Sequence, residues 1–225
     1  MILIIGAMQE EVFALTSLMS DVRSTRVSGV DVYTGVLSNQ EVIVAQSGVG
    51  KVNAAYTASS LIGVYKPHIV LNIGSAGGLK SDQKHGDMVV ATHLQYHDLD
   101  IGPGTQTDKR FIFETDANLF QTAKKTLESM EKRYHVGLIV SGDQFVTKSS
   151  QAFLNIQKHF SDAICVEMEA TAIAHVCHRS QTPFIVLRGL SDVTHDPEND
   201  IDFEQYLPLA SKVSAALCQA FILNL

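Results

Sequence analysis

Two glutamates stand in the middle of an apolar run. The stretch AICVEMEATAIAHVCH, residues 163–178, contains Glu167 and Glu169 among Ala, Ile, Val, Cys and Met. A buried ionised carboxylate loses its hydration, so it must be paired or hydrogen-bonded. At a helix start Glu169 is favoured as the anion, and in a half-dry pocket it would accept hydrogen bonds from two neighbouring hydroxyls, such as those of a ribose. Glu167 is expected to support that site or to cap the helix.

Charged residues also follow two other apolar runs. In LRGLSDV, residues 187–193, Arg188 and Asp192 interrupt a strand-like segment. They could form a structural salt bridge, but Asp192 also stands where a proton-shuttling acid is expected. In GAMQEEV, residues 6–12, Glu10 and Glu11 fall in a first helical turn. There they either complement the helix dipole or take part in chemistry.

Three glycine-containing segments complete the set of candidate loops. The segment QSGVGKVNAA, residues 46–55, lacks the spacing of a phosphate or dinucleotide loop, so it predicts a glycine turn whose Val49 could line a pocket. The segment NIGSAGGLK, residues 72–80, predicts a ligand-binding loop over residues 75–78, with a bare glycine turn as the alternative. In SGDQFV, residues 141–146, Phe145 is suited to stacking on a flat heterocycle or to packing under its own loop.

Alternating strand and helix patterns position these segments. Strands are expected over 2–6, 30–37, 41–47, 68–74, 86–93, 136–141, 162–166 and 184–190. Helices are expected over 9–19, 50–65, 116–132, 150–158, 168–179 and 203–224. The alternation predicts a single three-layer α/β/α domain over residues 1–225, with a mixed, mostly parallel sheet and one hairpin at 30–47. Ligands of such sheets bind at the carboxyl ends of the strands, where the candidate residues lie.

Composition excludes several functional classes. The 225 residues carry a net charge of −7 without a long run of Lys or Arg, which argues against a nucleic-acid partner. The opening MILIIG is too short for a signal or a membrane span and predicts a first buried strand. Three cysteines without metal or redox spacing favour a reducing, cytoplasmic location. The pairs His93/His97 and His175/His178 lack a third ligand, so no metal is predicted.

The acidic segment THDPENDID, residues 194–202, lacks the central glycine and the final glutamate of a calcium loop. We therefore expect it to form a mobile lid over the strand ends.

Taken together, GAMQEEV, SGVGKVNAA, NIGSAGGL, VSGDQFV, VEMEATAIAHVC and RGLSDV resemble the bacterial 5′-methylthioadenosine/S-adenosylhomocysteine nucleosidases. The resemblance runs from Met1 to the C-terminal helix, and it implies a nucleoside phosphorylase-like fold. It further implies a homodimer that cleaves the N-glycosidic bond of 5′-methylthioadenosine, S-adenosylhomocysteine and also 5′-deoxyadenosine. The products are adenine and the thioribose, in methionine salvage and the activated methyl cycle. No cofactor, nucleic acid or membrane is implied.

The resemblance also assigns roles to individual residues. Asp192 would protonate N7 of adenine, oriented by Ser191, while Phe145 stacks on the base and the backbone of Val146 holds its edge. We expect a raised pKa for Asp192, because the acid must keep its proton near neutral pH.

On the sugar side, Glu169 would bind the ribose hydroxyls, with Met168 packing on the sugar. Glu11 would activate the attacking water, and Arg188 would position that water and Glu169. The remaining residues would form the pocket loop and the apolar wall around the sugar and the 5′-thio group: Ser75, Ala76, Gly77, Met8, Val49 and Phe203.

One segment departs from the family pattern, and three alternatives stay open. The segment YHDLDIGPGTQTDKRF, residues 96–111, is shorter than in relatives, where this region lies near the dimer interface and shapes the 5′-substituent pocket. A futalosine or aminodeoxyfutalosine nucleosidase would share the same machinery. A purine nucleoside phosphorylase would need cationic groups around phosphate, and the first loop supplies Gln9, Glu10 and Glu11 instead. A catalytically silent nucleoside-binding protein would need only the ribose and base contacts.

Overall fold

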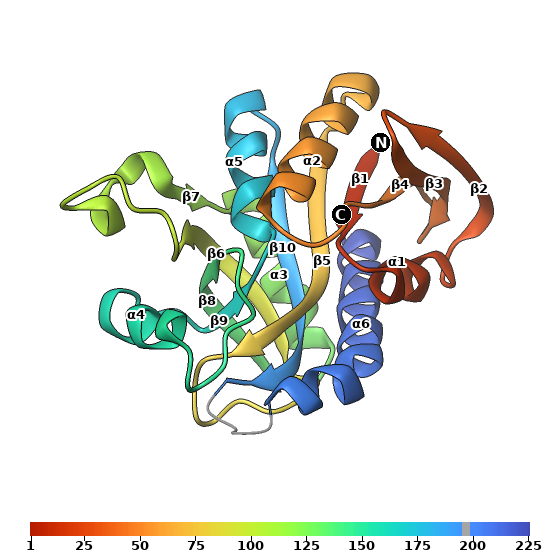
Figure 1. Cartoon of the computed structure of the whole chain (residues 1–225). Coiled ribbons are helices and arrows are strands. Elements are labelled where there is room, and N and C mark those ends of the chain that lie inside the picture. The colour runs from red at the N-terminus through yellow and green to blue at the C-terminus, as the bar shows by residue number, and fades with distance from the viewer. Residues whose placement is uncertain (195–198) are drawn as a thin grey trace.

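A mixed β-sheet forms the centre of the molecule (Figure 1). A computed structural model describes residues 1–194 and 199–225, with side chains given for all of these except 199–202. Among these residues the strands are β1 (Ile2–Gly6), β2 (Ser20–Val27), β3 (Val30–Leu37), β4 (Gln40–Gln46), β5 (Ile69–Gly78), β6 (Met88–Tyr96), β7 (Ile112–Glu114), β8 (Tyr134–Ser141), β9 (Cys165–Glu167) and β10 (Phe184–Val193).

The strands pair in the order β10-β6-β8-β9-β5-β1-β4-β3-β2, and β7 pairs with β6. β10 also pairs with β5 in parallel, so the five strands β5, β9, β8, β6 and β10 close into a ring. The pairs of β1 with β4 and β5 are parallel, while β2, β3 and β4 form an antiparallel meander. The predicted mixed sheet and the hairpin at 30–47 are confirmed.

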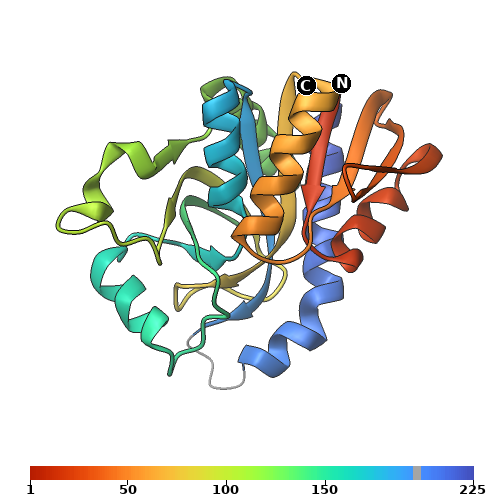
Figure 2. The same ribbon diagram turned by 45° about the horizontal axis from the view of Figure 1, so that its top comes forward.

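Helices cover the sheet on two sides (Figures 1 and 2). They are α1 (Gln9–Thr16), α2 (Lys51–Tyr65), α3 (Ala117–Ser129), α4 (Gln151–His159), α5 (Ala170–Ser180) and α6 (Asn199–Leu223), and two 3₁₀ turns span Thr105–Thr107 and Lys109–Phe111. α2 packs on α5, and α6 packs on α1 and α3. Each of these helix groups covers an apolar core cluster formed with alternate residues of the buried strands. The predicted three-layer α/β/α arrangement is confirmed.

Three predictions about individual elements differ from the structure. β2 was not expected, because its sequence SDVRSTRV forms an almost fully exposed edge strand and therefore lacks the apolar alternation of a half-buried strand. The short β7 was missed for lack of length. Residues 75–78 were expected to form a loop, yet they continue β5, because they pair with β10 and with β9.

Helix α6 is the longest helix of the described chain. Its segment Phe203–Leu223 is long and apolar enough to cross a membrane by length and composition, and 56% of its most apolar window is buried inside the fold. Its contacts with β5 and β10 account for this apolar character, since a core helix satisfies the same criteria.

Candidate active site

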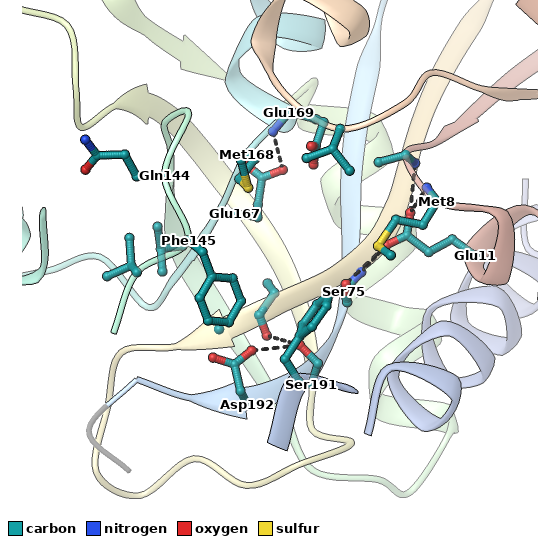
Figure 3. Close-up of a pocket in the computed structure, with 17 residues that line it drawn as sticks. Met8, Glu11, Ser75, Gln144, Phe145, Glu167, Met168, Glu169, Ser191 and Asp192 are labelled. Atoms are coloured by element: carbon teal, nitrogen blue, oxygen red, sulfur yellow. Dashed lines mark hydrogen bonds between the residues drawn. The ribbon is translucent and has the colours of Figure 1, made fainter. Parts of the chain in front are cut away.

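A pocket of about 230 Å³ lies where β1, β5, β9 and β10 end. Figure 3 shows carboxylates reaching it from separate elements, with Asp192 and Phe145 on one side and Glu11 and Met8 on another. The lining is completed by neighbours of these residues and by four further segments: Ala7, Val49, Ser75, Ala76, Gly77, Gln144, Val146, Val166, Glu167, Met168, Glu169, Ser191 and Phe203. Such a mixture of apolar walls and a few converging polar groups is typical of a small-molecule site.

Asp192 is aimed into the pocket by an irregularity in β10. The register with β5 shifts between Leu190 and Asp192, which is a β-bulge, and a bulge re-aims the side chain that follows it. Ser191 Oγ donates to Asp192 Oδ1 at 2.8 Å. A side chain at Gly77 would place its Cβ only 2.8 Å from Asp192 Oδ2, so glycine at this position makes room for the carboxyl group. Asp192 itself is buried.

Glu11 is held in one orientation by four donors. Its Oε2 accepts from the N–H groups of Ala7 and Met8 at 2.8 and 3.1 Å, and its Oε1 accepts from the N–H and hydroxyl of Ser75 at 2.9 and 3.2 Å. Gly74 lies directly against the carboxylate, because a Cβ there would meet Oε1 at 2.7 Å. Glu11 is therefore a fixed acceptor at the pocket wall, which is more than a first-turn acid complementing the dipole.

Glu167 caps a helix and also neutralises a buried arginine. Its Oε2 accepts from the N–H groups of Glu169 and Ala170 at 3.0 and 2.8 Å and from Arg188 Nη2 at 2.8 Å, while Oε1 accepts from Ser141 Oγ. The two expected roles, support and capping, are therefore combined in one side chain.

Arg188 pairs with Glu167 and donates a hydrogen bond to Asn72. The interpretation of Arg188 and Asp192 as a structural salt bridge is therefore wrong. Arg188 is 1% exposed and lies behind Glu167.

Glu169 is the N-cap residue of α5, and it is buried. Its Oε1 accepts from Gly50 N–H at 2.7 Å. Burial and the neighbouring Glu167 raise the pKa of Glu169 to about 8, although the Gly50 N–H and Arg188 act in the opposite direction. Desolvation and the charge of Glu167 therefore oppose the anion that the helix start is expected to favour.

An aromatic pair faces the carboxyl groups. The ring of Phe145 is 43% exposed and meets the ring of Phe203 edge-on, with a centroid distance of 5.4 Å. Phe145 is thus available at the pocket wall instead of being packed under its loop. Val146 beside it is buried.

The structure brings together every predicted site residue except Arg188 in the pocket wall. Sequence reasoning missed Ala7, Gln144 and Val166, which are sequence neighbours of predicted residues and carry no chemical signal of their own. The predicted lid at 194–202 falls, apart from Thr194, outside the residues whose structure and side chains are both described. In the part of the chain that the structure describes, no cluster of three or more His, Cys, Asp or Glu side chains could hold a metal.

The model of the phosphorylase superfamily matches residues 1–223. The closed ring of strands and the pocket with acidic and aromatic residues at the strand ends therefore belong to a protein of this α/β class. Solved structures are similar over the whole chain. A 5′-methylthioadenosine/S-adenosylhomocysteine nucleosidase from Neisseria meningitidis, in complex with methylthio-immucillin-A, is 36% identical, with 100% of this chain and 99% of that chain covered and a TM-score of 0.92. An S-adenosylhomocysteine nucleosidase from Streptococcus pyogenes is 36% identical, with 100% and 96% covered and a TM-score of 0.93. The chain belongs to the phosphorylase superfamily and, within it, to the methylthioadenosine/adenosylhomocysteine nucleosidase family.

A further similar structure has a different name. The futalosine hydrolase of Helicobacter pylori is 32% identical, with 100% of this chain and 97% of that chain covered and a TM-score of 0.90. The fold alone therefore does not separate these nucleosidase activities.

Proposed function

We propose that the protein hydrolyses the N-glycosidic bond of 5′-methylthioadenosine and S-adenosylhomocysteine to release adenine and the thioribose. It also hydrolyses 5′-deoxyadenosine, which gives adenine and 5-deoxyribose. The observation that carries this proposal is the placement of Asp192 and Glu11 on different sides of one pocket, with Glu169 at a third position (Figure 3). Glycosidic cleavage needs an acid at the leaving base and a base at the incoming water, so two separated carboxyl groups fit the reaction.

In this mechanism Asp192 donates its proton to N7 of adenine while the bond between C1′ and N9 breaks. The bonding electrons leave with the base, and positive charge develops on the sugar. A water then bonds to C1′, and Glu11 accepts the proton that this water loses. Ser191 donates a hydrogen bond to Asp192 Oδ1 and so orients the carboxyl group in the pocket. The fixed carboxylate of Glu11 stabilises the developing cation without reorganising.

Recognition of the sugar and base is assigned to the remaining walls. Glu169 accepts hydrogen bonds from the ribose hydroxyls, with Met168 against the sugar, while Phe145 stacks on adenine and the Val146 backbone holds its edge. Arg188 acts through Glu167, since its guanidinium is bound there and fixes the strand end that precedes Glu169. Met8, Val49 and Phe203 form the apolar surface that the 5′-thio group requires.

Hydrolysis is favoured over phosphorolysis by the charge of the pocket. Among the described residues that line it, none is Lys or Arg, whereas four are Asp or Glu: Glu11, Glu167, Glu169 and Asp192. A phosphate dianion would meet carboxylates without a compensating cation, which is unfavourable in a buried site.

The proposal extends to the setting of the enzyme. Buried free thiols at Cys165, Cys177 and Cys218 fit a reducing cytoplasm. A homodimer is supported by exposed apolar residues on α2, where Val52 and Tyr56 are 80% and 55% exposed and continue from Val49 at the pocket rim. Release of adenine and the thioribose would give the enzyme a role in methionine salvage and the activated methyl cycle.

A substrate panel tests the proposal. Release of the free base is measured with methylthioadenosine, S-adenosylhomocysteine, 5′-deoxyadenosine, aminodeoxyfutalosine and inosine, each with and without phosphate. We expect adenine release from the first three without phosphate. Strict phosphate dependence would identify a phosphorylase. Exclusive turnover of aminodeoxyfutalosine would identify an aminodeoxyfutalosine nucleosidase, the second candidate function, which the similarity to a futalosine hydrolase supports.

A further inference from the structure

Three loops at the pocket rim are tied together by one lysine and two aspartates. Lys51 follows the turn after β4, Asp98 follows β6 and Asp143 follows β8. These three residues, called the Lys51 cluster below, do not line the pocket. The catalytic scheme above leaves them without a role.

The contacts within the Lys51 cluster are direct. Lys51 Nζ lies 2.5 Å from Asp98 Oδ2 and 3.5 Å from Asp143 Oδ2. The backbone N–H of Asp143 donates to Asp98 Oδ2 at 2.9 Å, so the two aspartates are also joined to each other. Burial raises the pKa of Asp98, but hydrogen bonds from Lys51 and Asp143 outweigh it and lower the pKa below the usual value, which keeps Asp98 ionised.

Asp143 also supplies the cap that α2 lacks. The N-cap residue of α2 is Gly50, which has no side chain to accept from the first turn. Asp143 Oδ1 accepts from the N–H of Lys51 at 2.8 Å instead, so a carboxylate from another loop stands at this helix N-terminus. The helix start is thereby fixed to the loop that carries Phe145.

The same helix start reaches Glu169. Gly50 has φ +96°, a conformation that favours glycine, and its N–H donates to Glu169 Oε1 at 2.7 Å. One residue further along, the N–H of Lys51 is on Asp143. Any shift of the Lys51 backbone therefore moves the Gly50 N–H relative to Glu169. A carboxylate oxygen has more than one acceptor site, so Glu169 can keep this bond while it accepts a hydroxyl.

We propose that Lys51, Asp98 and Asp143 are positioning residues that hold the Gly50 N–H on Glu169 and so determine how strongly the enzyme recognises the ribose hydroxyls. The inference rests on the ribose role of Glu169 in the proposed function. It adds that this recognition is set by an ion cluster outside the pocket. The side chains of Lys51 and Asp98 are 25% and 21% exposed, so solvent weakens each pair and the cluster acts as a network more than as a single bond.

The test measures binding of two ligands that differ only in the ribose hydroxyls. The ligands are 5′-methylthiotubercidin, whose base lacks N7 and so resists protonation there, and its 2′,3′-dideoxy counterpart. The dissociation constant of the dideoxy ligand divided by that of 5′-methylthiotubercidin, both measured by calorimetry, reports hydroxyl recognition alone. We expect Lys51→Met and Asp98→Asn each to lower this ratio about fivefold, the effect of one hydrogen bond. The double variant should lose little more, because both changes break one network.

Controls separate positioning from general damage. Lys51→Arg should keep most of the ratio, and Lys124→Met, which removes an exposed charge on α3, should keep all of it. Circular dichroism and urea unfolding establish that each variant is folded. An unchanged ratio in Lys51→Met overturns the inference, whether both affinities stay the same or both fall equally. A ratio of one in the unmodified enzyme refutes the ribose role of Glu169, and the inference with it, while adenine release in the substrate panel is judged separately.

Discussion

Asp192 and Glu11 differ in how they are held, and the difference matches their proposed tasks. Glu11 accepts four hydrogen bonds from two segments of the chain that fix its carboxylate at the pocket wall, whereas Asp192 follows a β-bulge in β10 and is oriented by the hydroxyl of Ser191. A fixed acceptor suits the group that takes a proton from water, and a buried carboxyl group aimed into the pocket suits the group that gives one to the base.

Replacing Asp192 by Asn should abolish turnover and leave ligand binding largely intact. The amide keeps the shape of the side chain but has no acidic proton for N7, and the loss of a general acid typically slows a reaction by about 10²- to 10⁴-fold. Adenine release measures turnover, and calorimetry with a methylthio nucleoside analogue measures binding. Wild-type turnover in this variant would refute the role of Asp192.

Binding of a nucleoside near pH 7 should release up to about one proton. Glu169 has a pKa of about 8, so below this pH it is mostly protonated. Two hydroxyl donors bind best to the ionised form, so the ligand lowers the pKa and expels the proton, and affinity should rise with pH up to about 8. The groups that share this electrostatic environment are Glu167, Arg188 and Glu11.

Calorimetry in buffers of different ionisation enthalpy counts the released protons. The 2′,3′-dideoxy ligand, which lacks both hydroxyl donors, serves as the control and should release almost none. Equal proton release by both ligands would contradict a ribose contact at Glu169.

Glu167→Gln should destabilise the fold by about 3 kcal/mol, because it leaves the fully buried Arg188 without a counter-charge. Urea unfolding measures the change in the free energy of unfolding. Glu128→Gln, at an exposed position on α3, is the matched control and should change this free energy by less than about 0.5 kcal/mol. A loss no larger than that of the control would mean that the buried pair is not needed.

At the scale of elements, β5 brings its backbone against the two carboxyl groups that are proposed to be catalytic. Gly74 lies on Glu11 and Gly77 lies on Asp192, so the glycine-rich end of one strand leaves room for both. This part of the sequence was predicted as a ligand loop for its open N–H groups. In the structure this segment is a paired strand, and its glycines let the backbone approach the carboxyl groups of Glu11 and Asp192 closely.

Gly74→Ala should therefore slow adenine release by about 100-fold, since the new Cβ displaces the Glu11 carboxylate. Adenine binding, which depends on the opposite side of the pocket, should stay within about twofold. Gly63→Ala in α2 is the control, because nothing lies within 4 Å of a Cβ there, and it should stabilise the helix by about 0.5–1 kcal/mol. Wild-type turnover in Gly74→Ala would show that Glu11 tolerates the displacement.

Elements could be predicted from the sequence where burial imposed a pattern. The apolar strands around β1, β5 and β10 were evident, and because the chemistry of such a sheet lies at its strand ends, nearly the whole pocket followed from them. The exposed β2 leaves no such pattern. The partner of Arg188 could not be found either, since it depends on how β9 and β10 approach each other across the sheet.

For the whole molecule, α2 has an apolar side that a single chain leaves exposed. Val52 and Tyr56 lie one helical turn apart on α2, and Val49 in the turn before the helix also lines the pocket. A second copy that covers this surface would complete the wall around the 5′-substituent. Oligomeric state and substrate recognition would then be linked.

Val52→Lys should convert the proposed dimer to a monomer and weaken binding of methylthioadenosine analogues more than binding of adenine. A lysine at the centre of an apolar interface would have to be desolvated without a partner, which typically costs several kcal/mol. Sedimentation velocity at micromolar concentration measures the oligomeric state, and calorimetry with the two ligands measures recognition. Leu223→Lys places the same charge at a 69% exposed apolar position on α6 and should leave both properties unchanged. A dimer that survives Val52→Lys would exclude this side of α2 as the interface, and a monomeric unmodified enzyme would refute the dimer itself.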